Sequence, residues 1–200
     1  AVGVLESCAQ RPGFMKAAEK RDFAGVLPYL QLLNQNHGEL DAIFIADREG
    51  VLWANYPVDR QGFGKNLSGR DWYKGVSRTW KPYISSAFRL IVLEKGLAIA
   101  VSVPISNGQG EITGILGSAQ RTGFLAALIR PNSIDPKKRI TIIEQEGNII
   151  YSDSVEYEKE ITPYPYFEAI QHALRSGSHF LAVHGRSKTG GDLVAFSPVS

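Results

Sequence analysis

One nine-residue pattern occurs twice in this sequence, and the repeat limits the possible folds more than any other feature. Residues 45–53 (IADREGVLW) and 142–150 (IIEQEGNII) both read as a short apolar run, an acidic turn that ends in glycine, and a second apolar run. This pattern is typical of a β-hairpin in which glycine supplies the positive φ of the turn. The copies lie 97 residues apart, and each is followed by a helical segment and further strands. The order predicts a tandem duplication of one small α+β unit.

The N-terminal residues and the segment after the first hairpin are predicted to be helical. Residues 1–36 have apolar side chains at helical spacing, although Pro12 and Pro28 argue against one straight rod. A second helix is predicted to open at Ser68, with Ser68 as the N-cap and Asp71 reaching back to it as in a capping box.

Three strands and a short helix are predicted to complete the first unit. The strands cover residues 83–93, 98–105 and 112–120, and the turn Asn107–Gly110 joins the last two. The short helix covers residues 121–129, and residues 131–136 are the best candidate for a linker because proline stands at both ends.

The repeat divides the chain into three parts. We predict an N-terminal helical stalk at 1–38, a first module at 39–130 and a second module at 131–200. The strand at 98–103 with Pro104-Ile105-Ser106 is matched by residues 193–197 with Pro198-Val199-Ser200. The first unit then continues into another strand, so the second module is expected to lack its last strand.

Composition argues against several classes of function. The 22 basic and 20 acidic residues leave a formal net charge of +2, so the chain has no broad charge to attract nucleic acid. The single cysteine excludes an intrachain disulfide and a cysteine zinc site. No apolar run approaches the roughly 18 residues that cross a bilayer.

The histidine and acidic residues of the sequence do not form a recognisable catalytic or metal-binding site. His179 and His184 lie on opposite faces of a predicted strand, so they are poorly placed to share a metal. The acidic residues of the two repeated turns, Asp47, Glu49, Glu144 and Glu146, are interpreted as solvated turn carboxylates. No nucleophile–base pair is recognisable. We therefore predict no catalytic residue, no metal and no cofactor.

One cluster combines residues that suit a small anionic ligand. Arg70, Trp72 and Tyr73 fall in the first turn of the second predicted helix, just after a glycine-rich loop. A helix N-terminus attracts anions through its unpaired N–H groups, and an arginine adds a bidentate donor for a carboxylate. Tyr83 and Ser85 begin the next strand, on the expected opposite side of the site. The residues alone leave a second interpretation open, in which Arg70 pairs with a nearby acid and Trp72 fills the core.

The order of these elements resembles the double Cache domains, the PAS-like extracytoplasmic sensors of bacterial and archaeal receptors. The resemblance is carried by residues 47–50, 55–57, 64–73, 82–85, 103–105 and 110–117 (DREG, NYP, GKNLSGRDWY, PYIS, VPI and GEITGILG). The segment 64–73 is the most specific of these. The likeness is closer over residues 40–125 than over 140–200.

The resemblance implies a fold and a place in a larger protein. The fold is a long N-terminal helix followed by two tandem PAS-like modules, each a central antiparallel sheet flanked by helices. The module at 39–130 is then membrane-distal and holds the ligand, and the module at 131–200 is membrane-proximal. From the resemblance we further expect transmembrane helices outside the fragment, a homodimer that pairs through the N-terminal helix, and a histidine kinase, a chemoreceptor or a cyclic-dinucleotide enzyme as the output. The fragment itself is then expected to be an extracytoplasmic, non-enzymatic sensor.

The resemblance also suggests which class of ligand to expect. Members that bind α-amino acids carry an Arg-x-Trp-Tyr run, which residues 70–73 match. They also carry a tyrosine where this chain has Lys65, and aspartates where it has Ser85 and Gln120. A buried ammonium without an anionic partner is costly. A small carboxylate without a charged amine is therefore expected.

The expected site consists of residues from the helix start, the next strand and the last distal strand. They are Arg70, Trp72, Tyr73, Tyr83, Ser85 and Gln120. The alternative is a spacer or protein-interaction module that binds no small molecule, which an exposed apolar patch favours.

Overall fold

The computed structural model of the chain describes residues 1–89, 97–124, 140–152, 160–177, 180–183 and 192–195. Several predictions therefore lie wholly or largely outside the described residues. These are the linker at 131–136, most of the helix at 121–129, the strand residues 90–93, the pair His179 and His184, and the C-terminal residues 196–200.

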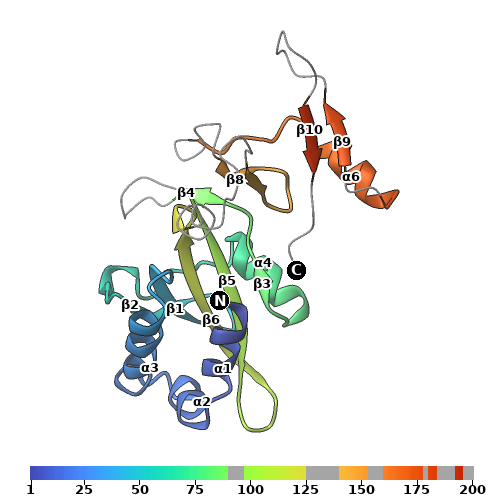
Figure 1. The fold of residues 1–200 in the computed structure, drawn as a ribbon. Coiled ribbons are helices and arrows are strands. Elements are labelled where there is room, and N and C mark those ends of the chain that lie inside the picture. Colours follow the sequence, from blue (N-terminus) through green and yellow to red (C-terminus); the bar gives the residue numbers. More distant parts are fainter. Residues whose placement is uncertain (90–96, 125–139, 153–159, 178–179, 184–191, 196–200) are drawn as a thin grey trace.

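A six-stranded antiparallel sheet lies at the centre of the first part of the chain (Figure 1). Its order is β2-β1-β6-β5-β3, and β4 also pairs with β5. The strands are β1 (Ala42–Asp47), β2 (Leu52–Tyr56), β3 (Tyr83–Ile84), β4 (Phe88–Arg89), β5 (Leu97–Ser106) and β6 (Ile112–Arg121). The two hairpins predicted from the sequence, β1–β2 and β5–β6, are confirmed.

The strand predicted at 83–93 begins where expected but is interrupted. The backbone N–H of Ala100 donates to the side-chain Oγ of Ser85 at 2.9 Å, in place of a main-chain acceptor. The ladder therefore breaks after Ile84 and resumes at Phe88.

The N-terminal residues form three helices, so the prediction of one long helix is wrong. The helices are α1 (Val2–Ala9), α2 (Pro12–Glu19) and α3 (Phe23–Asn36). Pro12 starts α2, because proline fits the first helical turn but not a helix interior. Arg21 has a φ of 51°, and Asp22 caps α3 by accepting the N–H of Gly25 at 3.0 Å. Pro28 lies inside α3 without ending it.

These three helices cover one face of the sheet. Leu5, Phe14 and Leu30 are fully buried and share a core cluster with Ile45 and Val103 of the sheet. The N-terminal residues are thus part of the folded core, held there by burial of apolar surface.

A fourth helix, α4 (Asp71–Thr79), packs on the opposite face. Trp72 and Val76 lie against Ala100 and Ile115 of the sheet. The prediction that Ser68 caps this helix is wrong, because the N-cap is Arg70. The carboxylate of Asp71 does not reach back along the chain, since it accepts the N–H of Ser86 at 2.8 Å. A short 3₁₀ turn, η1 (Arg60–Gly62), precedes this region.

The remaining described elements follow β6 in the chain, and the first two of them form the second copy of the repeated hairpin. They are β7 (Thr141–Ile143), β8 (Ile149–Ser152), α6 (Phe167–Arg175), β9 (Phe180–Val183) and β10 (Asp192–Ala195). Here β7 pairs with β8 and β9 with β10, as two separate two-stranded sheets within the described residues. None of the helices in the described ranges is long and apolar enough to cross a bilayer.

Each of the two repeated hairpins, β1–β2 and β7–β8, makes the same backbone hydrogen bonds, and the residues involved are 97 positions apart. The N–H of Leu67 donates to the carbonyl of Gly50 at 2.8 Å, and that of Tyr164 donates to Gly147 at 2.8 Å. Val51 bridges to Asn66, and Asn148 to Pro163. Both turn glycines have positive φ, 85° and 89°. The repeated hairpin is therefore real in geometry as well as sequence, while the domain boundaries stay a prediction.

Candidate ligand-binding site at the start of helix α4

The chain enters α4 through a tight turn. The N–H of Ser68 donates to the side chain of Asn66 at 2.9 Å, and the N–H of Arg70 donates to the carbonyl of Leu67 at 2.9 Å. Arg70 is extended at the N-cap, and its side chain makes no capping hydrogen bond. The first N–H groups of α4 thus lack the acceptor that a serine or aspartate N-cap would supply, which favours an anion there.

Arg70 is exposed to solvent in this arrangement. Its guanidinium makes no hydrogen bond or ion pair among the residues that the structure describes, so the pairing with Asp71 left open by the sequence does not form. The positive charge of Arg70 therefore lies at the uncapped start of α4, and both features attract a negatively charged ligand.

The two aromatic residues that follow have different environments. Trp72 is only 6% exposed, and its ring centroid lies 4.8 Å from that of Phe44. Tyr73 is half-buried, and its hydroxyl donates to the carbonyl of Arg48 at 2.9 Å. Trp72 is consequently a core residue with its neighbour Tyr73 stacked edge-on at 6.0 Å.

Tyr83 lies beside α4 and is tied to it. Its hydroxyl is 3.3 Å from both carboxylate oxygens of Asp71 and accepts from Nε2 of Gln145 at 3.1 Å. A methyl group on residue 75 would collide with the Tyr83 ring. The ring can therefore pack on the helix only because Gly75 has no side chain. Burial raises the pKa of the Tyr83 phenol; the hydrogen bond from Gln145 lowers it, and the charge of Asp71 raises it.

Ser85 and Gln120 have structural partners. Ser85 is buried, and its Oγ donates to the carbonyl of Ser86 while accepting from Ala100, both at 2.9 Å. Gln120 is 3% exposed and donates to Ser118 at 3.4 Å. Gln120 lies four residues after Leu116 on β6 and therefore on the same face of the strand. Leu116 packs in the core under α1–α3, so Gln120 faces away from α4. Arg70, Trp72, Tyr73 and Tyr83 are gathered around α4, and Gln120 is on the other face of the sheet.

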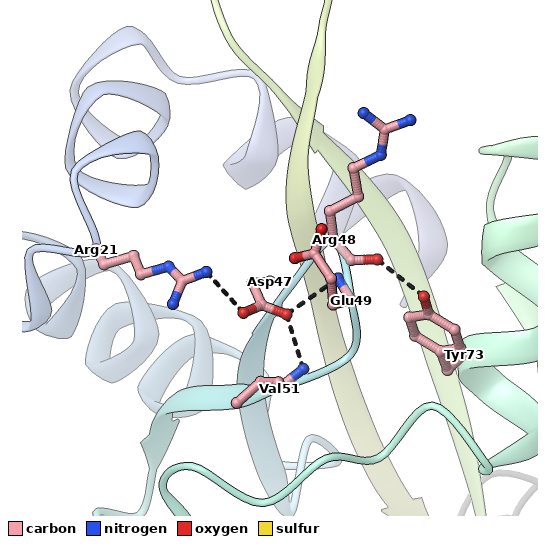
Figure 2. Close-up of polar contacts among 6 residues, drawn as sticks. All are labelled: Arg21, Asp47, Arg48, Glu49, Val51 and Tyr73. Atoms are coloured by element: carbon pink, nitrogen blue, oxygen red, sulfur yellow. Dashed lines mark hydrogen bonds and ion pairs between the residues drawn. The ribbon is translucent and has the colours of Figure 1, made fainter.

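Asp47, at the end of β1, is buried, so the interpretation of its side chain as a solvated turn carboxylate is wrong. Asp47 is 5% exposed. One of its oxygens accepts the N–H groups of Glu49 at 3.0 Å and Val51 at 2.8 Å, and the other lies 2.6 Å from the guanidinium of Arg21 (Figure 2). The signal was the spacing Asp-x-x-Gly, which places the carboxylate over the amides of its own turn.

The fold resembles that of solved ligand-binding domains of chemoreceptors and of an extracellular ligand-binding receptor. The chain resembles the ligand-binding domain of the Pseudomonas fluorescens chemoreceptor CtaA, solved with L-isoleucine (TM-score 0.69, 19% identity, 98% of this chain and 76% of that one). It also resembles the ligand-binding domain of the Pseudomonas aeruginosa amino acid chemoreceptor PctB, solved with L-Gln (TM-score 0.67, 14% identity, 98% and 75%).

A third similar structure is an extracellular ligand-binding receptor from Desulfohalobium retbaense (TM-score 0.61, 17% identity). The alignment covers 92% of this chain but 35% of that one, so the chain spans about a third of its length. No family model and no curated protein sequence matches the chain. At these identities the likeness establishes the fold alone.

Proposed function

We propose that the chain is the ligand-binding sensor domain of a transmembrane signalling receptor and that it recognises a small organic carboxylate at the start of α4. One observation carries the proposal: the N-terminus of α4 has no side-chain cap, and the guanidinium of its N-cap residue, Arg70, has no partner among the described residues. A carboxylate at this point accepts from the helix N–H groups and from the guanidinium together.

The surrounding residues favour a ligand without an ammonium group. The carboxylate of the next residue, Asp71, already accepts the N–H of Ser86 and faces the hydroxyl of Tyr83. Ser85 and Gln120 are neutral. The proposed site is therefore Arg70 with Tyr73 and Tyr83 beside it and Trp72 beneath. Ser85 supports the site by holding β3 to β5, and Gln120 is left out because it faces α1–α3.

We also propose how the modules are arranged along the chain and where they lie in the receptor. Two tandem PAS-like modules, membrane-distal at 39–130 and membrane-proximal at 131–200, are supported by the repeated hydrogen bonds of the β1–β2 and β7–β8 turns. The receptor is proposed to place this part outside the cytoplasm, to pair through its N-terminal helices, and to end in a chemoreceptor, histidine kinase or cyclic-dinucleotide output.

Calorimetric titration tests the proposal with a panel of acetate, pyruvate, L-lactate, succinate, L-isoleucine and L-glutamine. We expect one of the four acids to bind more tightly than either amino acid. Arg70→Ala is expected to weaken that binding by at least about tenfold, because a hydrogen bond to a charged group contributes about 1.5–3 kcal/mol. Arg78→Ala is the matched control, since Arg78 is an exposed arginine in the last turn of the same helix.

Two outcomes contradict this function. Tighter binding of an amino acid than of every acid reverses the ligand class, and equal affinities for the Arg70→Ala and Arg78→Ala variants remove Arg70 from the site. In either case circular dichroism must show that both variants keep the helix content of the parent.

A hollow between α1 and α3 favours a second candidate, a spacer or protein-interaction module. It has a volume of about 250 Å³ and includes Val4, Cys8, Tyr29 and Leu33 in its lining. Leu32, also in the lining, is 43% exposed. Absence of heat with every member of the panel, from a folded protein, selects this alternative.

A further inference from the structure

We propose that Asp47 is a positioning residue that joins the α2–α3 turn to Tyr73 of α4, so that occupancy of the α4 site and packing of the N-terminal helices depend on each other. The inference rests on the proposed function for its ligand-binding half. Asp47 does not touch the proposed ligand and acts through the turn that follows it.

The β1–β2 turn is held from both faces of the sheet (Figure 2). On the side of α1–α3, Arg21 approaches Asp47 at 2.6 Å from the turn between α2 and α3. On the side of α4, the hydroxyl of Tyr73 donates to the carbonyl of Arg48 at 2.9 Å, and the Tyr73 ring lies against Gly50. The guanidinium of Arg48 also stands 5.8 Å from the ring centre of Trp80, just after α4.

The charge of Asp47 is not what forms the turn, because a neutral residue forms the same turn elsewhere in the chain. In the β5–β6 turn, Oδ1 of Asn107 accepts the N–H groups of Gln109 at 3.0 Å and Glu111 at 2.9 Å. Oδ1 of Asp47 makes the same two bonds to Glu49 and Val51. The second oxygen of Asp47 is therefore surplus to the turn, and it points to Arg21.

The second copy of the repeated hairpin keeps the turn, but within the described part of the chain it has neither polar connection. Both carboxylate oxygens of Glu144 accept within their own turn, from Glu146 and from Asn148. The ring that lies against Gly147 is that of Phe167, which has no hydroxyl. Among the residues that the structure describes, the connection across the sheet thus occurs only in the copy that lies beside the proposed site.

The backbone of Arg21 supports a specific role for the ion pair. Its φ of 51° is a left-handed conformation that non-glycine residues adopt at a cost, and such conformations persist where surrounding contacts hold them. Within the described residues, Asp47 supplies the ion pair at this position.

Two variants break the connection with little other change. Asp47→Asn keeps the Oδ1 acceptor, as Asn107 does, and replaces the oxygen that faces Arg21. Arg21→Asn removes the guanidinium and leaves a residue that tolerates positive φ. The matched control is Asp41→Asn, which breaks another ion pair at the opposite end of β1, where Asp41 lies 2.7 Å from Arg121.

Amide hydrogen exchange without ligand tests the connection directly. The reporters are the N–H groups of Arg21 and Asp22, which donate to the carbonyls of Ala18 and Ala17 near the end of α2 at 3.0 and 2.9 Å. Tyr73→Phe removes a hydroxyl on the far face of the sheet. It is expected to speed exchange of these reporters by about threefold in the parent and in Asp41→Asn, and by less than about 1.5-fold in Asp47→Asn. No change with Tyr73→Phe, or the same change in all three backgrounds, overturns the proposal.

Titration with the tightest-binding acid of the panel tests the ligand half. Asp47→Asn and Arg21→Asn are expected to weaken binding by about threefold to tenfold, while Asp41→Asn leaves the affinity unchanged. Unchanged affinity in the first two variants overturns the dependence of binding on Asp47. Absence of binding to the parent instead refutes the proposed function, and the exchange result without ligand still decides whether Asp47 connects the two layers.

Discussion

Substitution of Asp47 by alanine and by asparagine separates the turn from the ion pair energetically. Alanine removes all three interactions of a side chain that is 7% exposed: the N–H bonds from Glu49 and Val51 and the pair with Arg21. Each N–H bond to a charged acceptor contributes on the order of 1.5 kcal/mol, at the lower end of the range. Asparagine loses only the pair, whose arginine is 57% exposed and solvent-screened, so about 1 kcal/mol is lost.

We therefore expect Asp47→Ala to lower the free energy of unfolding by about 3–4 kcal/mol and Asp47→Asn by about 1 kcal/mol. Equilibrium urea unfolding, followed by circular dichroism at neutral pH, measures both values. Equal losses in the two variants refute the reasoning, because they would mean that the turn amides gain nothing from the retained Oδ1 acceptor.

Two other predictions concern burial. Burial raises the pKa of the Cys8 thiol from 9.0 to about 11, so the stability from the neutral thiol is complete below pH 9 and is lost as pH rises toward 11. Urea unfolding at pH 8 and pH 11 should show the parent losing about 2 kcal/mol more than Cys8→Ala, and parallel profiles would contradict this. Gly75→Ala places a methyl group against the Tyr83 ring. It should lower the unfolding free energy by about 1–3 kcal/mol and weaken acid binding, whereas unchanged values in both measurements would contradict the packing of Tyr83 on α4.

Features set by local sequence were predictable. The β1–β2, β5–β6 and β7–β8 hairpins follow from apolar runs around a glycine turn, and that information lies within about ten residues. The buried position of Trp72 in the core was also predictable, as one of the two interpretations that the sequence left open for this residue. The repeat offset of 97 also recurs in the hydrogen bonds of Gly50 and Gly147.

Features set by distant partners were not predictable. The N-cap of α4 is Arg70 and not Ser68 as predicted. The carboxylate of Asp71 bonds to Ser86, 15 residues away, and is therefore not available to reach back to Ser68. The break at Arg21 is accompanied by an ion pair with Asp47, 26 residues away. The sequence predicts Gln120 in the site, whereas the register of β6 puts it on the other face of the sheet, and the sequence does not reveal that register.

The most direct measurement is a crystal structure of this chain grown with the tightest-binding acid of the panel. The account predicts a carboxylate within hydrogen-bond distance of the Arg70 guanidinium and of the first N–H groups of α4, with Tyr73 and Tyr83 on either side. An acid bound elsewhere, with the Arg70 side chain extended into solvent, would contradict it.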